Sequence, residues 1–505
     1  MTLKIAIVGA GSIGFTRRLV RDILSVQELA DTHFAFQDIS ERNLDMVTRL
    51  CRREIEANGV GATLDATLAR EPALAGADYV INTARVGGLE GFRTDVEIPL
   101  KYGVDQCVGD TICAGGLMYG QRTVPMIVEL TEQIERYAGA STTLLNYANP
   151  MAMNTWAALD ASPVNTIGLC HGVQGGHHLL AHLFERHVNE GRSPEDPGYR
   201  RVTKADVDIV AAGINHQTWY VKVLFEGRDW ARDLLGLFEA DERMRQREKV
   251  RIDIIRRFGY FSTESNGHLS EYLPWYRKRP DEIPDWTSTD AWILGETGGY
   301  LRVCTENRNW FETDFPNWLE AEPATFDSAK RSDEHGSWII EAMETGRVYR
   351  GHFNVRNRGV IPNLPPDAIV EVPGYVDRNG LAIPGVGDLP LGAAAICNNS
   401  IQVQRMATRA AIAGDADLLK QAILLDPLVG AVCNPPEVWQ MVDEMLVAQA
   451  EWLPQYGGQI EGARRRLATQ PSLARNRGDG AVRLKTRTVE ELRSTSQGTG
   501  LSRPG

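Results

Sequence analysis

The chain has 505 residues, and at roughly 150 residues per domain this length predicts about two to four domains, each with its own core. Hydrophobic residues make up 43% and charged residues 24%, which is typical of a globular protein and excludes a collagen-like or disordered chain. With 54 basic and 66 acidic residues the net charge is -12, so nucleic acid and anionic membranes are disfavoured as partners. The expected partner is a small molecule.

The seven cysteines are an odd number and widely spaced, which is not the pattern of a disulfide framework and indicates a reducing compartment. The apolar run near the N-terminus is only as long as a strand and leads directly into glycines, so it does not resemble a signal peptide. No run approaches the roughly 18 apolar residues that a membrane helix needs. We therefore expect a cytoplasmic protein.

The first part of the chain alternates between strand and helix patterns. It begins with a β-branched strand at 4–8, a glycine turn and an amphipathic helix at 15–26. Later strands are expected at 33–38, 78–84, 142–150 and 164–170, with helices at 40–57, 70–76 and 121–137. The alternation predicts an α/β fold with a Rossmann-like, doubly wound parallel sheet, whose ligands bind at the carboxyl ends of the strands.

The alternation becomes irregular after residue 195, before a new strand at 207–215 and two helices at 402–413 and 436–450. We expect a Rossmann-like domain at 1–195, a mixed α+β domain for substrate binding and oligomerisation at 196–457, and a basic tail at 458–505. The last 45 residues hold ten basic and four acidic side chains. Such a tail is expected to be loosely held, or to wrap back onto its own or a neighbouring subunit.

The turn after the first strand has the spacing of a dinucleotide-binding loop. The expected cofactor-binding residues are Gly9, Gly11, Ser12, Ile13 and Gly14, with Asp38 at the end of the next strand. Backbone N–H groups and the helix N-terminus would bind a pyrophosphate, while Asp38 would accept the ribose hydroxyls. Because this acid would repel a 2′-phosphate, NAD⁺ is expected rather than NADP⁺. The alternative is a purely structural glycine turn.

Polar side chains also follow the later strands. Asn146 and Asn149 end the fourth strand, where a nicotinamide or substrate would lie, and Asn146 is assigned to the cofactor. Cys170 and His171 follow one strand later, and His216 follows the next. Thiolate, imidazole and carboxamide groups at one sheet edge are able to form an open divalent-metal site. The alternative is a buried cysteine and a hydrogen-bonded core histidine.

Two other regions are rich in functional side chains. Arg85 follows the third strand and is a further cofactor-binding candidate, and Asp110, a glycine-flanked acid, is a catalytic candidate. The segment 260–278 combines acids, a histidine and cations with three tyrosines. These tyrosines are Tyr260, Tyr272 and Tyr276. A tyrosine near a metal is able to lose its proton and act as a base.

Six motifs in order make the chain resemble glycoside hydrolase family 4, the NAD- and metal-dependent glycosidases. They are GAGSIGF, GDTICAGG, LNYANPMAMNTW, LCHGVQ, AGINHQTW and FGYFSTESNGHLSEYLPW. The resemblance runs from residue 3 to about 455 and extends to the bacterial α-galactosidase branch. His171 resembles the branch that acts on unphosphorylated sugars, whereas Gly172 departs from the Cys-His-Ser of galactosidases. Activity on α-galactosides is implied, with α-glucosidase, α-glucuronidase and α-galacturonidase as alternatives.

The resemblance implies a hydrolysis that departs from the usual two-carboxylate mechanism. Carbon 3 of the sugar is transiently oxidised by NAD⁺, carbon 2 loses a proton, and the aglycone leaves carbon 1 before water adds. Mn²⁺ or another divalent metal would stabilise the enolate. By role, the resemblance implies metal binding by Cys170 and His216, substrate binding by Asn149, acid catalysis by His171 and base catalysis by Tyr272. Tyr260 and Tyr276 stay open as alternative bases.

Two other classes of protein share part of this pattern. A malate- or lactate-type NAD-dependent dehydrogenase also combines a glycine loop, a ribose-binding acid and an Asn-Pro strand end, but it needs no Cys/His pair and is usually far shorter. Net consumption of NAD⁺ would indicate that class. A non-catalytic NAD-binding sensor would leave Cys170, His216 and Tyr272 without a role. The family resemblance further indicates a homodimer or homotetramer.

Overall fold

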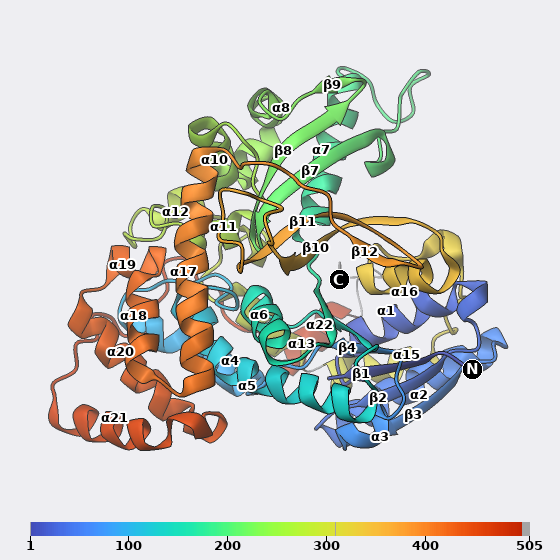
Figure 1. Cartoon of the computed structure of the whole chain (residues 1–505). Coiled ribbons are helices and arrows are strands. Elements are labelled where there is room, and N and C mark those ends of the chain that lie inside the picture. Colours follow the sequence, from blue (N-terminus) through green and yellow to red (C-terminus); the bar gives the residue numbers. More distant parts are fainter. Residues whose placement is uncertain (1, 309, 497–505) are drawn as a thin grey trace.

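A computed structural model describes residues 2–308 and 310–496, and its named strands form one sheet (Figure 1). The first strands are β1 (Lys4–Val8), β2 (His33–Gln37), β3 (Thr63–Thr67), β4 (Tyr79–Asn82), β5 (Thr143–Asn146) and β6 (Asn165–Gly168). The later strands are β7 (Val207–Ile214), β8 (Gln217–Phe225), β9 (Arg228–Asp229), β10 (Tyr349–Arg356), β11 (Ile369–Asp377) and β12 (Gly380–Ala382). Their order is β3-β2-β1-β4-β5-β6-β10-β11-β7-β8-β9, with β12 paired to β11.

The pairs among β1 to β6 are all parallel, and those among the later strands are antiparallel. The predicted doubly wound parallel sheet is therefore confirmed, and so is the mixed character of the second half. The later strands extend the same sheet, because β10 pairs with β6 at Asn354 and Gly168.

Helices cover both faces of the sheet. In the first half they are α1 (Ile13–Leu24), α2 (Glu41–Asn58), α3 (Arg70–Leu74), α4 (Gly88–Lys101), α5 (Cys113–Tyr137), α6 (Met151–Ala161) and α7 (Gly172–Val188). The middle of the chain has α8 (Leu234–Ala240), α9 (Glu242–Arg247), α10 (Lys249–Phe258), α11 (Asn266–Tyr272), α12 (Ile283–Trp286), α13 (Gly299–Asn307), α14 (Trp310–Thr313), α15 (Phe315–Glu320) and α16 (His335–Thr345). The last are α17 (Leu391–Ala413), α18 (Ala416–Leu425), α19 (Pro427–Val432), α20 (Pro435–Ala448), α21 (Gly457–Thr469) and α22 (Val489–Ser496).

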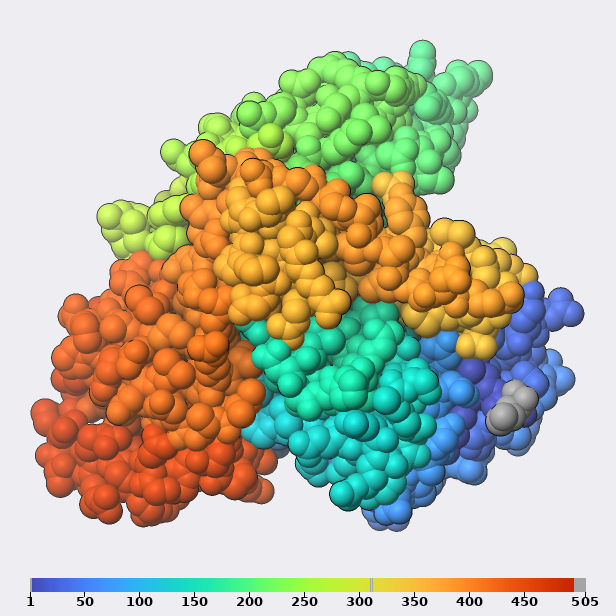
Figure 2. Space-filling model, in the orientation of Figure 1, coloured from blue at the N-terminus to red at the C-terminus, as the bar shows by residue number. Residues whose placement is uncertain are grey.

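Strand β1 shows how the sequence divides the core between the two faces. Its alternate residues Ile5 and Ile7 belong to a buried cluster with α1, α2 and α16. Ala6 and Val8 point the other way, into a cluster with α5, α17, α18 and α20. The C-terminal helices, orange to red, therefore pack directly against the teal segments of the first half (Figure 2). No helix in the described ranges is both long and apolar enough to span a bilayer.

The basic tail contacts its own chain at several described residues. The backbone N–H of Ala481 donates to Asp105 Oδ2 at 3.0 Å, and Arg487 Nη2 lies 2.7 Å from Glu306 Oε2. The prediction that the tail wraps back onto its own subunit is confirmed.

Candidate active site

In the loop between β1 and α1, the first two glycines of the predicted motif lie where a side chain would clash with neighbouring atoms. Gly9 has a φ of +84°, and a Cβ there would lie 2.6 Å from the backbone nitrogen of Ala84. A Cβ on Gly11 would lie 2.7 Å from Asp38 Oδ2. Both positions therefore require glycine, for the turn at Gly9 and for the approach of the acid at Gly11.

The N-terminus of α1 is open to a ligand. Ser12 is the N-cap but makes no side-chain capping hydrogen bond, and both Ser12 and Gly14 are exposed above the buried Ile13. The first N–H groups of a helix have no intrahelical acceptor and carry partial positive charge. A pyrophosphate fits these requirements.

Asp38 lies beside this loop at the carboxyl end of β2. Its Oδ2 accepts the N–H of Gly11 at 2.8 Å, and its Oδ1 accepts the N–H of Ser40 at 2.8 Å. The carboxylate is half-buried, and each oxygen keeps a second lone pair for a ribose hydroxyl. The structure thus brings together Gly9, Gly11, Ser12, Ile13, Gly14 and Asp38.

Arg85 lies in an aromatic cage just after β4. Its guanidinium carbon is 4.2 Å from the ring centre of Phe92, 4.8 Å from that of Tyr119 and 5.7 Å from that of Tyr300. Burial disfavours its charge, but the neighbouring Tyr119, followed by weaker effects that include Asp110, raises the pKa of Arg85. These contacts fix the cation on the side of the site that carries Asp110.

Asn146 and Asn149 have different surroundings at the end of β5. Asn146 is fully buried, and its Nδ2 donates to the backbone oxygen of Ala148 at 3.1 Å while its Oδ1 accepts from Asn82 at 2.8 Å. Asn149 is half-buried and donates to Asp110 Oδ2 at 2.9 Å. Asn146 therefore supports the turn, whereas Asn149 reaches the polar side chains described next.

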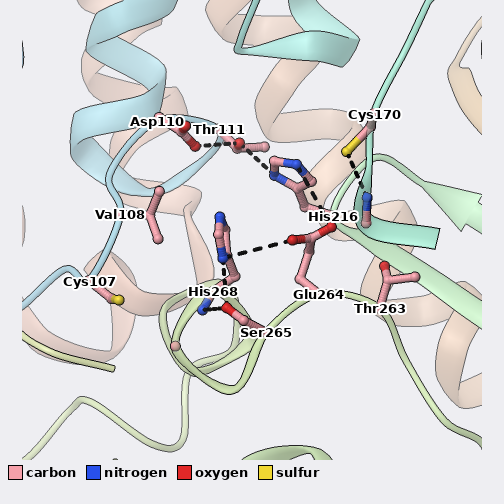
Figure 3. Close-up of polar contacts among 12 residues, drawn as sticks. Cys107, Val108, Asp110, Thr111, Cys170, His216, Thr263, Glu264, Ser265 and His268 are labelled. Carbon is pink, nitrogen blue, oxygen red and sulfur yellow. Dashed lines mark hydrogen bonds and ion pairs between the residues drawn. The ribbon is translucent and has the colours of Figure 1, made fainter. Parts of the chain in front are cut away.

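Cys170, His216 and Glu264 point toward one another at the carboxyl edge of the sheet (Figure 3). Cys170 follows β6, His216 lies in the turn between β7 and β8, and Glu264 lies in the loop before α11. Their sulfur, a ring nitrogen and a carboxylate oxygen all lie within 4.8 Å of one another. The predicted pair of Cys170 and His216 is thus brought together, and Glu264 joins it as a third side chain.

The backbone holds His216 in an unusual conformation. Residues 215 and 216 form the tight two-residue connection between β7 and β8, and His216 has a φ of +64°. A non-glycine residue in this left-handed region costs about 1–3 kcal/mol and is enriched at functional sites. The turn directs the imidazole into the cluster, where it is 5% exposed.

A chain of hydrogen bonds fixes the ring of His216 (Figure 3). Thr111 Oγ1 donates to Asp110 Oδ1 at 2.9 Å, and it lies 2.8 Å from His216 Nδ1. Because the hydroxyl proton is used on Asp110, Nδ1 carries the ring proton and donates to Thr111. His216 Nε2 therefore keeps its lone pair on the side of Glu264, whose Oε1 is 4.0 Å away.

The chemistry of this cluster fits a divalent metal. Glu264 Oε1 is buried and finds no hydrogen-bond partner among the described residues. Burial raises the pKa of the Cys170 thiol well above its usual value, and the carboxylates of Glu371 and Glu264 raise it further. A cation would satisfy the carboxylate oxygen and stabilise the thiolate. Thiolate, imidazole and carboxylate are ligands for divalent transition metals.

Tyr272 is the tyrosine of segment 260–278 that lies against the cluster. Its hydroxyl is 3.4 Å from His216 Nδ1, and the two rings are stacked with centres 6.0 Å apart. The hydroxyl of Tyr276 instead donates to Asp253 at 3.0 Å, and Tyr260 lies beneath an arginine side chain. The geometry therefore separates Tyr272 from the two alternatives.

His171 lies at the start of α7 with its side chain 55% exposed, and its Nε2 is 2.6 Å from Glu334 Oε2. Desolvation disfavours the charged ring, but the hydrogen bond and charge of Glu334 raise the pKa of His171 above its usual value. Glu334 thus favours the protonated form that a general acid needs.

Four residues around the cluster were not assigned from the sequence, namely Thr111, Glu264, His268 and Glu334. Thr111, Glu264 and His268 lie inside two of the six family motifs, GDTICAGG and FGYFSTESNGHLSEYLPW. Their position in these motifs, close to Asp110 and Tyr272, is a signal that would identify them as site candidates from the sequence. His268 forms a second group with Asp110 and His216 whose ligand atoms lie within 4.8 Å. Glu334 offers no such signal, because it is 163 positions from His171 and reaches it only through the fold.

Fold and site define an α/β enzyme that carries a dinucleotide-type glycine loop and, at the carboxyl edge of the same sheet, a cluster of metal-ligand side chains. Residues 4–185 match the family 4 glycosyl hydrolases, and residues 211–429 match the C-terminal domain of that family. The chain belongs to glycosyl hydrolase family 4. This membership selects a glycosidase over the dehydrogenase and sensor alternatives.

Three relatives illustrate the similarity. An α-galactosidase of Rhizobium meliloti (strain 1021) is 54% identical over 505 residues, 100% of both chains. An α-galactosidase of Bacillus subtilis (strain 168) is 32% identical over 457 residues, 90% of this chain and 99% of the relative. The 6-phospho-β-glucosidase of Thermotoga maritima, solved with manganese, NAD⁺ and glucose-6-phosphate, superimposes with a TM-score of 0.71 at 22% identity, covering 89% of this chain and 99% of that one. The last likeness shows a shared fold.

Proposed function

We propose that this protein hydrolyses α-galactosides with the help of NAD⁺ and a divalent metal such as Mn²⁺. The observation that carries the proposal is the cluster of Cys170, His216 and Glu264, which lies at the same sheet edge as the glycine loop. The two α-galactosidase relatives support the choice of sugar. When bound, NAD⁺ would accept a hydride from the sugar and the metal would act as a Lewis acid.

Each side chain then has a task that its position supports. Cys170 and His216 hold the metal, and Asn149 contacts the substrate. Tyr272 removes the proton from carbon 2 of the sugar, and His171 protonates the leaving oxygen. Asp110 acts in catalysis by holding Asn149 directly and His216 through its neighbouring threonine.

NAD⁺ is proposed to bind at the open N-terminus of α1 and the residues around it. The residues proposed to bind NAD⁺ are Gly9, Gly11, Ser12, Ile13, Gly14, Asp38, Arg85 and Asn146. For Asn146 the proposed contribution is to hold the turn at the end of β5, because its own polar atoms are engaged there.

A panel of p-nitrophenyl α- and β-glycosides tests the proposal, with NAD⁺, Mn²⁺ and a thiol reductant present. We expect release of p-nitrophenol from the α-galactoside well ahead of the other sugars. Faster hydrolysis of the α-glucoside, α-glucuronide or α-galacturonide would overturn the choice of sugar. A protein that hydrolyses none of the α-glycosides under these conditions would overturn the activity.

We also propose that the protein is a cytoplasmic homodimer or homotetramer. All seven cysteines are free thiols, which supports a reducing compartment.

The chain is further proposed to divide near residue 195 into a Rossmann-like domain and a substrate-binding domain. This division falls between the two family matches, 4–185 and 211–429, which supports it.

Asp38→Ala is expected to weaken NAD⁺ binding by about 10- to 100-fold, because a charged hydrogen-bond acceptor is lost. NADP⁺ binding should fall far less, since the variant also removes the charge that repels the 2′-phosphate. Titration calorimetry with NAD⁺ and NADP⁺ measures the ratio of their dissociation constants. The control is Glu41→Ala, which removes an exposed acid on the first turn of α2. A wild-type protein that prefers NADP⁺ would contradict this assignment.

Glu334→Gln is expected to lower the pKa of His171, because it removes the negative charge that favours the imidazolium. If His171 is the acid, activity is lost as the ring deprotonates, so the basic limb of kcat/KM should move to lower pH. Asp333→Asn is the control, since that carboxylate pairs with His178 at 2.6 Å instead. Identical basic limbs in wild type and Glu334→Gln would exclude His171 as the titrating acid.

A further inference from the structure

Gly172 opens α7 two residues after Cys170, at a position where the carboxylate of Glu264 occupies the space of a side chain. A Cβ there would lie 1.6 Å from Glu264 Oε1 and 3.7 Å from Cys170 Sγ. Gly172 is the first residue of a regular helix, so its backbone conformation is open to any amino acid. A side chain at this position would therefore meet the carboxylate of Glu264 and would have to displace it, whereas the backbone sets no such limit.

The carboxylate of Glu264 faces two histidines, and its Oε1 is free to act as a metal ligand. Its side chain is 11% exposed, Oε1 lies 4.0 Å from His216 Nε2, and Oε2 lies 3.8 Å from His268 Nδ1. Oε1 has no hydrogen-bond partner among the residues that the structure describes. Ligand atoms about 2.0–2.3 Å from one metal ion are separated by distances up to about 4.5 Å, so the gap between Oε1 and His216 has the size of a shared ion.

We propose that Glu264 is a third protein ligand of the metal, beside Cys170 and His216, and that Gly172 is the residue that makes room for it. The inference rests on the proposed function, since it concerns the same metal. A thiolate and a carboxylate together carry two negative charges, which a divalent cation neutralises. The added oxygen ligand favours ions that accept oxygen, such as Mn²⁺, over ions that prefer an all-sulfur or all-nitrogen site.

The helix offers a matched pair of glycines for testing this proposal. A Cβ at Gly175, in the first turn of the same helix, meets no described atom within 4 Å. Gly172→Ala should push the flexible Glu264 side chain off the metal, whereas Gly175→Ala should leave it in place. Both changes replace glycine by a better helix former and are expected to leave the fold intact.

Mn²⁺ binding to chelator-treated protein, followed by the electron paramagnetic resonance of free Mn²⁺, measures the effect without relying on activity. We expect Gly172→Ala and Glu264→Ala to raise the Kd for Mn²⁺ by about 10- to 100-fold and Gly175→Ala to leave it unchanged. Glu264→Gln, which keeps the side-chain volume, should also weaken binding. Circular dichroism confirms that each variant is folded.

The double variant Gly172→Ala/Glu264→Ala shows whether the glycine acts through the carboxylate. Its Kd should equal that of Glu264→Ala alone, because the added methyl group no longer has a ligand to displace. A further tenfold loss would mean that the methyl group disturbs Cys170, and would overturn the role of Gly172. Wild-type Mn²⁺ affinity in both Glu264 variants would overturn the third ligand and leave the proposed function standing. A wild-type protein that binds no divalent metal would instead overturn the metal dependence of the proposed function.

Discussion

Removal of the metal, or of either predicted ligand, is expected to abolish hydrolysis and leave the protein folded. Dialysis against a chelator should lower kcat by more than about 100-fold, and added Mn²⁺ should restore it. Cys170→Ser and His216→Asn should come close to the chelated wild type, because each takes a thiolate or an imidazole out of the cluster of Figure 3 and leaves at most a neutral oxygen there. Asparagine is chosen at 216 because it tolerates the φ of +64° found there.

Metal content by elemental analysis, kcat and thermal unfolding together check this prediction. Cys433→Ser is the control, since that thiol is buried near the backbone oxygen of Tyr102. It should keep both its metal and its rate. Wild-type metal content and wild-type rate in the Cys170 and His216 variants would show that the cluster has been assigned wrongly.

The sheet is predictable from sequence because each buried strand carries a local signal. Strands such as β1 are short runs of β-branched and small residues, and their alternation with amphipathic helices predicts the parallel order. The strand β3 was missed because its sequence, TLDAT, is mostly exposed at the sheet edge. The helix α4 was missed because it begins at Gly88 and contains Pro99, both of which weaken a helix pattern.

The helix α5 extends further toward its N-terminus than its pattern predicts, beginning at Cys113 instead of residue 121. Gly115 and Gly116 lower the helix propensity of this first part. The structure shows why they are present, since a Cβ on Gly116 would lie 2.4 Å from the backbone carbon of Thr111. The glycines that close packing requires therefore weaken the helix pattern in the first part of α5, and the sequence does not predict it.

The site was predictable only where its residues follow strands. Cys170 follows β6 and His216 follows β7, two strands that β10 and β11 separate in the sheet, and the fold brings the two side chains within reach of one another. Glu264 depends on a loop, whose path no periodic pattern determines. The loop of Asp110 is positioned in the same indirect way, because Glu271 accepts the backbone N–H of Val108 at 2.8 Å and of Gly109 at 2.9 Å.

Tyr272→Phe is expected to lower kcat by about 1,000-fold, within the range attributed to a general base, and to change substrate affinity far less. The hydroxyl acts in the transition state, when the proton leaves carbon 2, whereas the ring that stacks on His216 is kept in phenylalanine. Steady-state kinetics on p-nitrophenyl α-galactoside measure both kcat and KM. Tyr276→Phe is the control, because that hydroxyl binds Asp253 away from the cluster.

Isotope exchange tests the same proton directly. If Tyr272 removes the carbon 2 proton, hydrolysis of an α-galactoside in D₂O should yield galactose that carries deuterium at carbon 2 and retains its anomeric configuration. A substrate already deuterated at carbon 2 should react more slowly where proton removal limits the rate. An ordinary two-carboxylate glycosidase never breaks this bond, so the label separates the two chemistries. Galactose recovered from D₂O without deuterium at carbon 2 would exclude proton removal by Tyr272 or by any other base.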